Sequence, residues 1–263
     1  GGKILLAPLG VDSLLDRLNQ RIRWQRWSER KNDWVACNAP RSIATLLLSR
    51  NGLWKFPPLV GVITAPTLRP DGSILDRPGY DPDTGLLLID HGANFPRIPD
   101  KPTATDGRAA LDLLLKEVLS GFPFAEPHDQ SAALSAILTA CVRHSLKFAP
   151  LHAFDAPRAG SGKTLLADAV ALIASGAPAT VMTFTPDPDE LRKRIMAVLL
   201  QGDSLINFDN LDEPLQGDSL CTVLTGETFS ERVLGANRNA TAPTICTWMV
   251  TGNNLIFHGD ITR

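Results

Sequence analysis

A run of small residues followed by a lysine and a threonine has the spacing of a phosphate-binding loop: positions 154–164 read FDAPRAGSGKT. Such loops bind the β- and γ-phosphates of a nucleotide with backbone N–H groups, an ammonium and a helix N-terminus, while a hydroxyl holds Mg²⁺. Gly160, Ser161, Gly162, Lys163 and Thr164 supply these groups in order. We therefore expect this stretch to bind a nucleoside triphosphate, with ATP and Mg²⁺ as the cofactors.

The loop departs from the usual spacing at its start. In the GxxxxGK[ST] pattern the first glycine would stand at position 157, where this chain has Pro157. The residues that follow, LLADAVALI at 165–173, are typical of a helix. Nucleotide contacts are thus expected from Ala159 through Leu165, after an altered turn.

A second candidate position for chemistry follows the apolar run SLINF, at 204–208. A carboxylate at the C-terminal end of a strand beside the loop can hold Mg²⁺, so Thr164 and Asp209 are the expected metal residues. The next residue, Asn210, can orient a water molecule but accepts its proton poorly. Two alternatives stay open: Asp209 also acts as the base, or Asp212 or Glu213 reaches the site.

A further apolar run, TWMVT at 247–251, is followed by Gly252, Asn253 and Asn254. An amide at this strand end could position the attacking water or contact the γ-phosphate, and Asn253 is the preferred candidate. Shortly afterwards comes Arg263, which could reach the γ-phosphate of a neighbouring subunit as an arginine finger.

Two β-prone segments between these strands are separated by GANRNA at 235–240, a turn-rich run that favours a hairpin. The tip of this hairpin would carry Asn237 and Arg238.

The elements that position these residues alternate after residue 149: strand, loop, helix, strand, helix, strand. This order predicts an α/β fold with a mainly parallel sheet flanked by helices, over residues 150–263. Before it, residues 106–149 show helical spacing in RAALDLLLKEVL and DQSAALSAILTACVRHSL, with Asp106 as a cap. We expect this helical segment to pack on the core.

Residues 1–105 differ from the rest and predict a small α+β module, winged-helix-like or a β-meander. Its first helix would cover VDSLLDRLNQRIRWQRW, capped by Asp12 or Ser13, and a second helix would cover RSIATLLLSR. We predict short strands at LVGVIT, SILD and LLLID and a linker at 96–105. Four of the five tryptophans lie here, and we interpret them as packing residues in preference to base-stacking platforms.

Composition limits the classes of protein without choosing among them. The chain is 44% hydrophobic with a net charge of −2, so nucleic-acid binding would need local basic patches or assembly. Four scattered cysteines without CxxC spacing favour reduced thiols, and no apolar run approaches the roughly 18 residues of a membrane span. A cytoplasmic location without a membrane is expected.

The order of these motifs resembles the superfamily 3 helicase branch of the AAA+ ATPases, in particular the primase-helicase and replication proteins of phages, plasmids and integrated mobile elements. The resemblance covers about residues 106–263 and rests on GSGKT, a strand ending in Asp-Asn, LTGE before a hairpin, TGNN and GDITR. It implies a P-loop NTPase core, here without a C-terminal lid, in a cytoplasmic, prokaryotic or phage-encoded protein. It also implies a hexameric ring that hydrolyses ATP between subunits and grips single-stranded or forked DNA with a pore hairpin, whose DNA-contacting residues would here be Asn237 and Arg238.

Two hypotheses follow for the function. The first is an ATP-dependent DNA helicase in which Lys163 holds phosphates, Asn253 or Asn210 orients water and Arg263 completes the neighbouring site. The alternative is a regulatory or scaffold module that uses ATP to switch assembly without unwinding, which Asn210 and the near-neutral charge favour. A small-molecule kinase is the weakest option, because no arginine-rich lid follows the loop.

Overall fold

The computed structural model describes residues 6–50, 53–90, 92, 95–99, 101–232 and 239–262, which divide into two compact units. The smaller unit comprises Leu6–Pro58, and the larger begins at Leu59. This division differs from the one suggested by the sequence at residue 105, because residues 59–90 belong to the larger unit.

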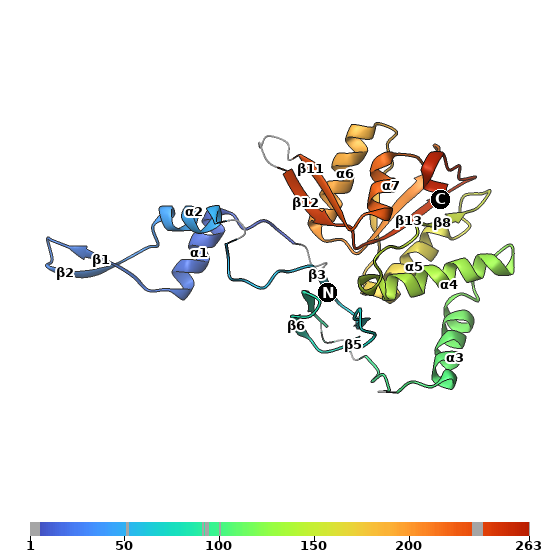
Figure 1. Ribbon diagram of the computed structural model, residues 1–263, viewed down its shortest axis with the longest axis horizontal. Coiled ribbons are helices and arrows are strands. Elements are labelled where there is room, and N and C mark those ends of the chain that lie inside the picture. The colour runs from blue at the N-terminus through green and yellow to red at the C-terminus, as the bar shows by residue number, and fades with distance from the viewer. Residues whose placement is uncertain are drawn as a thin grey trace. The chain divides into compact units, whose positions relative to one another are not determined.

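A four-stranded, all-parallel sheet forms the centre of the larger unit, with the strand order β8-β13-β10-β9 (Figure 1). The prediction of a parallel sheet within an α/β fold is confirmed. The strands are β8 (His152–Asp155), β9 (Thr180–Met182), β10 (Leu205–Leu211) and β13 (Thr247–Gly252).

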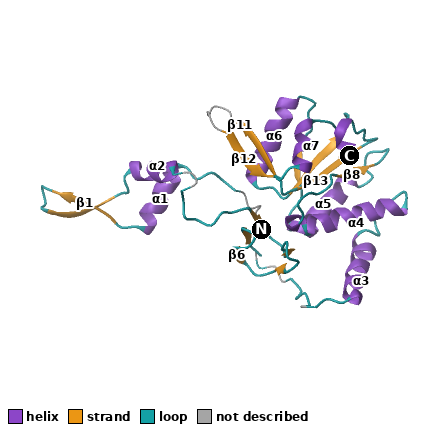
Figure 2. Cartoon of the chain, in the orientation of Figure 1, coloured by secondary structure: helices purple, strands orange, loops and turns teal. Residues whose placement is uncertain are grey.

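Helices cover both faces of this sheet (Figure 2), which explains why its central strands, β10 and β13, are buried in nearly every position. Trp248 and Val250 of β13 pack with α6 and α7, whereas Met249 between them packs with α4 and α5. The helices are α4 (Pro127–Cys141), α5 (Lys163–Ser175), α6 (Pro188–Gln201) and α7 (Asp218–Thr225).

The predicted helical segment starts earlier than expected. Helix α3 (Ala104–Leu113) continues into the π-helical turn η1 (Leu114–Val118), and short 3₁₀ turns lie at η2 (Arg143–Ser145) and η3 (Gly259–Thr262). The cap of α3 is Thr103, not Asp106, because the Asp106 carboxylate accepts from the Thr103 N–H at 2.8 Å while the Thr103 hydroxyl accepts from the Asp106 N–H at 3.3 Å. This reciprocal pair is a capping box.

Residues 59–90 form small strands around Ile63, Leu75, Leu86 and Leu88. A β-meander was the expectation, but β3 runs parallel to β7, and a meander contains only antiparallel pairs. The strands are β3 (Gly61–Ile63), β4 (Thr67–Leu68), β5 (Ile74–Leu75), β6 (Gly79–Asp81) and β7 (Leu86–Leu88).

In the smaller unit, α1 (Val11–Arg21) and α2 (Arg41–Ser49) flank a hairpin of β1 (Trp24–Ser28) and β2 (Asp33–Cys37). The first predicted helix was therefore too long, and its N-cap is Gly10 rather than Asp12 or Ser13. Residues 24–28 form a strand because a partner strand lies directly after the turn. Trp27 and Trp34, interpreted as packing residues, pack on each other with ring centroids 5.7 Å apart, but they are 48% and 57% exposed and do not belong to the core.

A second hairpin was predicted in the larger unit, and its strands β11 (Thr228–Arg232) and β12 (Asn239–Pro243) pair antiparallel. The predicted tip, with Asn237 and Arg238, lies outside the described residues, as does Arg263. In the described part of the chain, none of the helices has the length and hydrophobicity needed to cross a membrane.

Candidate functional site

The candidate site lies where β8, β13 and β10 end side by side. Because the three strands are parallel neighbours, their carboxyl ends meet at one edge of the sheet, which is where ligands bind in open α/β sheets. The glycine loop (residues 156–162) joins the end of β8 to the start of α5 at this edge. Residues predicted from three separate motifs are thereby brought together.

The ammonium of Lys163 is oriented by three acceptors. Its Nζ donates to Asn253 Oδ1 at 2.9 Å, to Ser161 Oγ at 3.0 Å and to the carbonyl oxygen of Arg158 at 3.1 Å. These acceptors come from the glycine loop and from the end of β13, so the lysine bridges the two. The arrangement presents a positive charge inside the loop, where an anion could replace some of these bonds.

The backbone of the glycine loop requires glycine at its last position. Gly162 has a φ of 87° and directly precedes the first residue of α5. Side chains are strained at this angle, which glycine adopts freely. The loop therefore turns sharply into α5, whose first-turn N–H groups lack acceptors within the helix, as an anion site needs.

Asp209 is the centre of a small hydrogen-bond network. Its Oδ1 accepts from the hydroxyl of Thr164 at 2.9 Å, from the hydroxyl of Thr251 at 2.6 Å and from Asn207 Nδ2 at 3.4 Å. Thr164 lies at the start of α5, whereas Thr251 lies at the end of β13. A carboxylate and a hydroxyl held side by side are hard oxygen ligands of the kind that Mg²⁺ prefers, so these residues fit the ion.

A cavity of about 340 Å³ opens beside these groups. Asp212 and Glu213, the other carboxylates considered for the base, are exposed and do not line it. Asp209 is thus the carboxylate linked to the site in the described residues, through the two threonines. The lining residues are Ala159, Gly160, Ser161, Gly162, Lys163, Thr164, Leu165, Asn210, Thr251 and Asn253.

Asn210 faces the cavity because β10 is irregular at its end. The register with β13 shifts between Phe208 and Leu211, and Asn210 takes a left-handed φ of 53°. Its backbone N–H donates to the Thr251 hydroxyl at 3.2 Å. This arrangement leaves the amide side chain free to contact a ligand, although an amide cannot take up a proton efficiently.

The two asparagines after β13 separate clearly. Asn253 is bonded to Lys163 and lines the cavity, whereas Asn254 is exposed and does not. The glycine before them is needed for the same geometry, because a Cβ on Gly252 would lie 2.6 Å from the carbonyl oxygen of Leu211. That distance is far below a normal contact, so Gly252 allows β10 and β13 to approach closely.

Sequence reasoning missed two residues of the network, Asn207 and Thr251. Both are buried, with exposed fractions of 1%, and both contact the Asp209 carboxylate. The sequence contained one indication of their role: each is a polar residue within or at the end of an apolar strand. A polar side chain that is buried there needs a hydrogen-bond partner.

Comparison with known proteins gives no relationship to set beside this geometry: the chain matches no family model and no curated protein sequence.

Proposed function

We propose that this protein is a P-loop ATPase that works as an ATP-dependent DNA helicase of the superfamily 3 type. The single observation that carries the proposal is the pairing of two side-chain contacts at one sheet edge: Lys163 with Asn253, and Thr164 with Asp209, both at 2.9 Å. These are the groups that a phosphate loop, a metal carboxylate and a water-positioning amide would need to place together.

Each of these residues has a distinct task in the proposed reaction. Lys163 and the N–H groups of the glycine loop bind the β- and γ-phosphates of ATP, and Thr164 and Asp209 hold Mg²⁺. The ion, when bound, neutralises charge that develops on the phosphate oxygens. Asn253 orients the attacking water, and Asn210 supplies a second amide beside it. Arg263 of a neighbouring subunit in the proposed hexamer would complete the site.

DNA would bind at the hairpin of β11 and β12 through Asn237 and Arg238 at its tip. The hairpin supports this role because it connects α7 with β13, and β13 ends at the candidate site. Asn253 directly follows β13, and the hairpin directly precedes it. A change in the contacts of Asn253 on hydrolysis could therefore reach the hairpin through β13.

A scaffold ATPase that binds nucleotide without unwinding is the second candidate. Asn210 favours it, because this amide stands next to the metal carboxylate and cannot accept a proton efficiently. A protein that held ATP without turning it over would need the binding groups and not a separate base.

The variant Lys163→Ala tests nucleotide use. We expect it to abolish ATP hydrolysis while keeping the circular dichroism and melting temperature of the parent, because the hydrogen bonds of the Lys163 ammonium are to the loop and Asn253 and not to the core. Lys193→Ala is the matched control, because Lys193 is exposed on α6 and its substitution removes the same charge. Normal hydrolysis by Lys163→Ala would refute the assignment of the loop.

A strand-displacement assay on a forked duplex separates the two candidates. A helicase should unwind the fork when ATP and Mg²⁺ are present and should fail with the Lys163→Ala variant. ATP binding measured with a fluorescent analogue, combined with no unwinding by the assembled protein, would favour the scaffold.

A further inference from the structure

The smaller unit carries a charge opposite to that of the rest of the chain. Residues 6–58 contain nine lysines and arginines and four aspartates and glutamates, a net charge of +5, whereas the whole chain has −2. A basic unit attached to an acidic remainder is a local electrostatic feature that the overall composition hides. Such a unit attracts polyanions.

The hairpin of β1 and β2 exposes two aromatic rings together. Trp27 and Trp34 stand directly opposite each other in the register, so both lie on the same face of the hairpin. Their ring centroids are 5.7 Å apart in an edge-to-face arrangement, and the rings are 48% and 57% exposed. Within the smaller unit, the hairpin extends away from α1 and α2, which leaves this face uncovered by either helix (Figure 1).

Basic side chains lie near the tryptophan pair. Arg23 precedes β1, and Arg30 and Lys31 occupy the turn that follows it, whereas Arg26, the residue before Trp27 in the strand, lies on the opposite face; all four are exposed. No ion pair with another described residue engages them, in contrast to Arg41, which pairs with Asp12. Their charges are therefore available to a ligand.

We propose that the hairpin face formed by Trp27 and Trp34, with Arg23, Arg30 and Lys31 around it, binds single-stranded nucleic acid. Exposed aromatic rings stack on bases of any sequence, and neighbouring cations follow the phosphates; together they form the usual site for single strands. Bases in a duplex are already stacked, so a ring pair of this kind selects for the single strand. An edge-to-face tryptophan pair also stabilises a hairpin, but that role alone needs no excess of unpaired cations.

This site is separate from the proposed ATPase centre and does not depend on it. The proposal concerns nucleotide-free binding by the smaller unit, whereas the proposed helicase contacts lie on the hairpin of β11 and β12. Binding to this face should therefore persist in Lys163→Ala, and a failure of one proposal leaves the other unaffected.

The test uses the full chain, without nucleotide, and measures the anisotropy of a fluorescein-labelled oligothymidine. The variant Trp27→Leu/Trp34→Leu keeps apolar side chains but removes the π faces, and it should weaken binding roughly tenfold or more. The control Trp27→Phe/Trp34→Phe keeps aromatic faces and should retain most of the affinity. Far-UV circular dichroism and thermal melting establish that the variants are folded.

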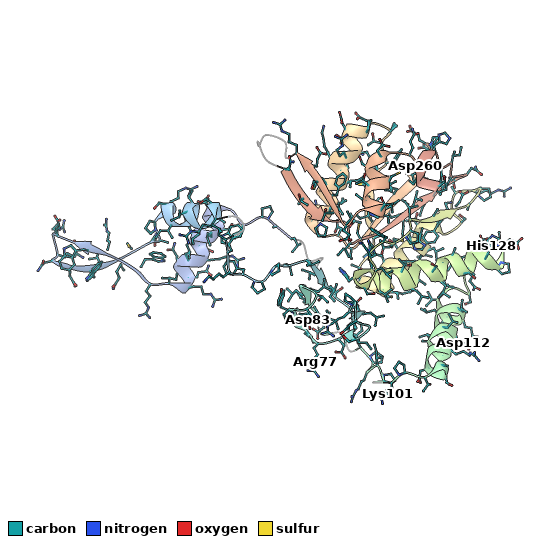
Figure 3. All side chains as sticks on the ribbon, viewed as in Figure 1. Arg77, Asp83, Lys101, Asp112, His128 and Asp260 are labelled. Carbon is teal, nitrogen blue, oxygen red and sulfur yellow. The ribbon has the colours of Figure 1, made fainter. Side chains whose placement is uncertain are left out.

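The charges are tested through the salt dependence of the same titration. Arg23→Ala/Arg30→Ala/Lys31→Ala should reduce the slope of log affinity against log salt by about 2, since each phosphate contact on a single strand contributes about 0.7. Arg77→Ala is the charge-matched control: this residue lies at the surface between β5 and β6, in the larger unit (Figure 3), and should leave the slope unchanged.

Three results would overturn the proposal. The first is an affinity for oligothymidine that is unchanged in Trp27→Leu/Trp34→Leu, or that falls equally in this variant and in Trp27→Phe/Trp34→Phe. The second is duplex DNA binding as tightly as the single strand. The third is competition by polyglutamate as effective as competition by oligothymidine, which would assign the face to an acidic protein surface.

Discussion

Replacing Asp209 separates its structural role from its proposed metal role. The variant Asp209→Asn keeps an oxygen that can accept from Thr164 and Thr251 but loses the negative charge. The variant Asp209→Ala removes the acceptor as well. Thr251 is 1% exposed and cannot turn its hydroxyl to water, whereas Thr164 is exposed and can. Only the alanine variant therefore leaves a buried hydroxyl without its acceptor.

The expected magnitudes follow from these exposures. An unsatisfied buried hydroxyl costs about 1–3 kcal/mol, which for a protein of this size corresponds to a drop in melting temperature of about 2–4 °C per kcal/mol. Asp209→Ala should melt lower by that amount, and Asp209→Asn should melt close to the parent. Hydrolysis should fall about 100-fold or more in both variants, because the charge that holds the metal ion is lost in both.

Differential scanning calorimetry and phosphate release, measured over a range of Mg²⁺ concentrations, give the two readouts. If Asp209→Asn hydrolysed ATP with the parent's Mg²⁺ dependence, Asp209 would not be the metal residue. If the alanine and asparagine variants melted at the same temperature, the hydroxyl network would not depend on this carboxylate. The two results are independent, so each tests one half of the reasoning.

Two further predictions concern the elements that support the site. Burial lowers the pKa of His152 from 6.5 to about 4. Between these two pH values the unfolded chain binds more protons than the folded chain. The free energy of unfolding should therefore fall by up to about 1.4 kcal/mol per pH unit as the pH drops below 6.5. Urea titrations between pH 7.5 and 4.5 measure this fall. The variant His152→Phe should weaken the pH dependence of the free energy of unfolding without removing it, because burial also lowers the pKa of His144. If His152→Phe had the same pH dependence as the parent, His152 would not be its source. Gly252→Ala should cost about 1–3 kcal/mol and reduce hydrolysis, because its Cβ would press on the carbonyl of Leu211. Gly107→Ala is the matched control: it lies in α3 with nothing near its Cβ and should be neutral or stabilising, so equal losses in both variants would refute the steric argument.

The sequence predicted those parts of the fold that local pattern determines. The apolar runs at 204–208 and 247–251 correspond to β10 and β13. Strands that are buried on both faces lack the alternation of apolar and polar residues, so they are recognisable as apolar runs. The second helix in the predicted alternation is α6 (Pro188–Gln201), which has Asp187 as its N-cap and Gly202 as its C-cap, both residue types that mark helix ends.

The errors occurred where a distant partner decides the structure. Helical spacing continues from Val11 beyond Arg21, and only pairing with residues 33–37 makes residues 24–28 a strand. The parallel pairing of β3 with β7 joins segments separated by three other strands, which no local turn signal reveals. In the site, the loop and Asp209 followed from motifs, whereas the contribution of Asn207 depends on which face of β10 it occupies.

Strand β13 sets the geometry of the candidate site, because consecutive residues at its end contact both halves of it. Thr251 donates to Asp209 on the β10 side, and Asn253 accepts from Lys163 on the glycine-loop side. Gly252 stands between them and lets the backbone of Leu211 approach. A shift of β13 by one residue would exchange the faces of its side chains and break both contacts together. The central position of β13, between β8 and β10, prevents such a shift, since it is hydrogen-bonded along both edges. The distance between the candidate phosphate and metal groups is therefore fixed by the register of the sheet rather than by the loop alone.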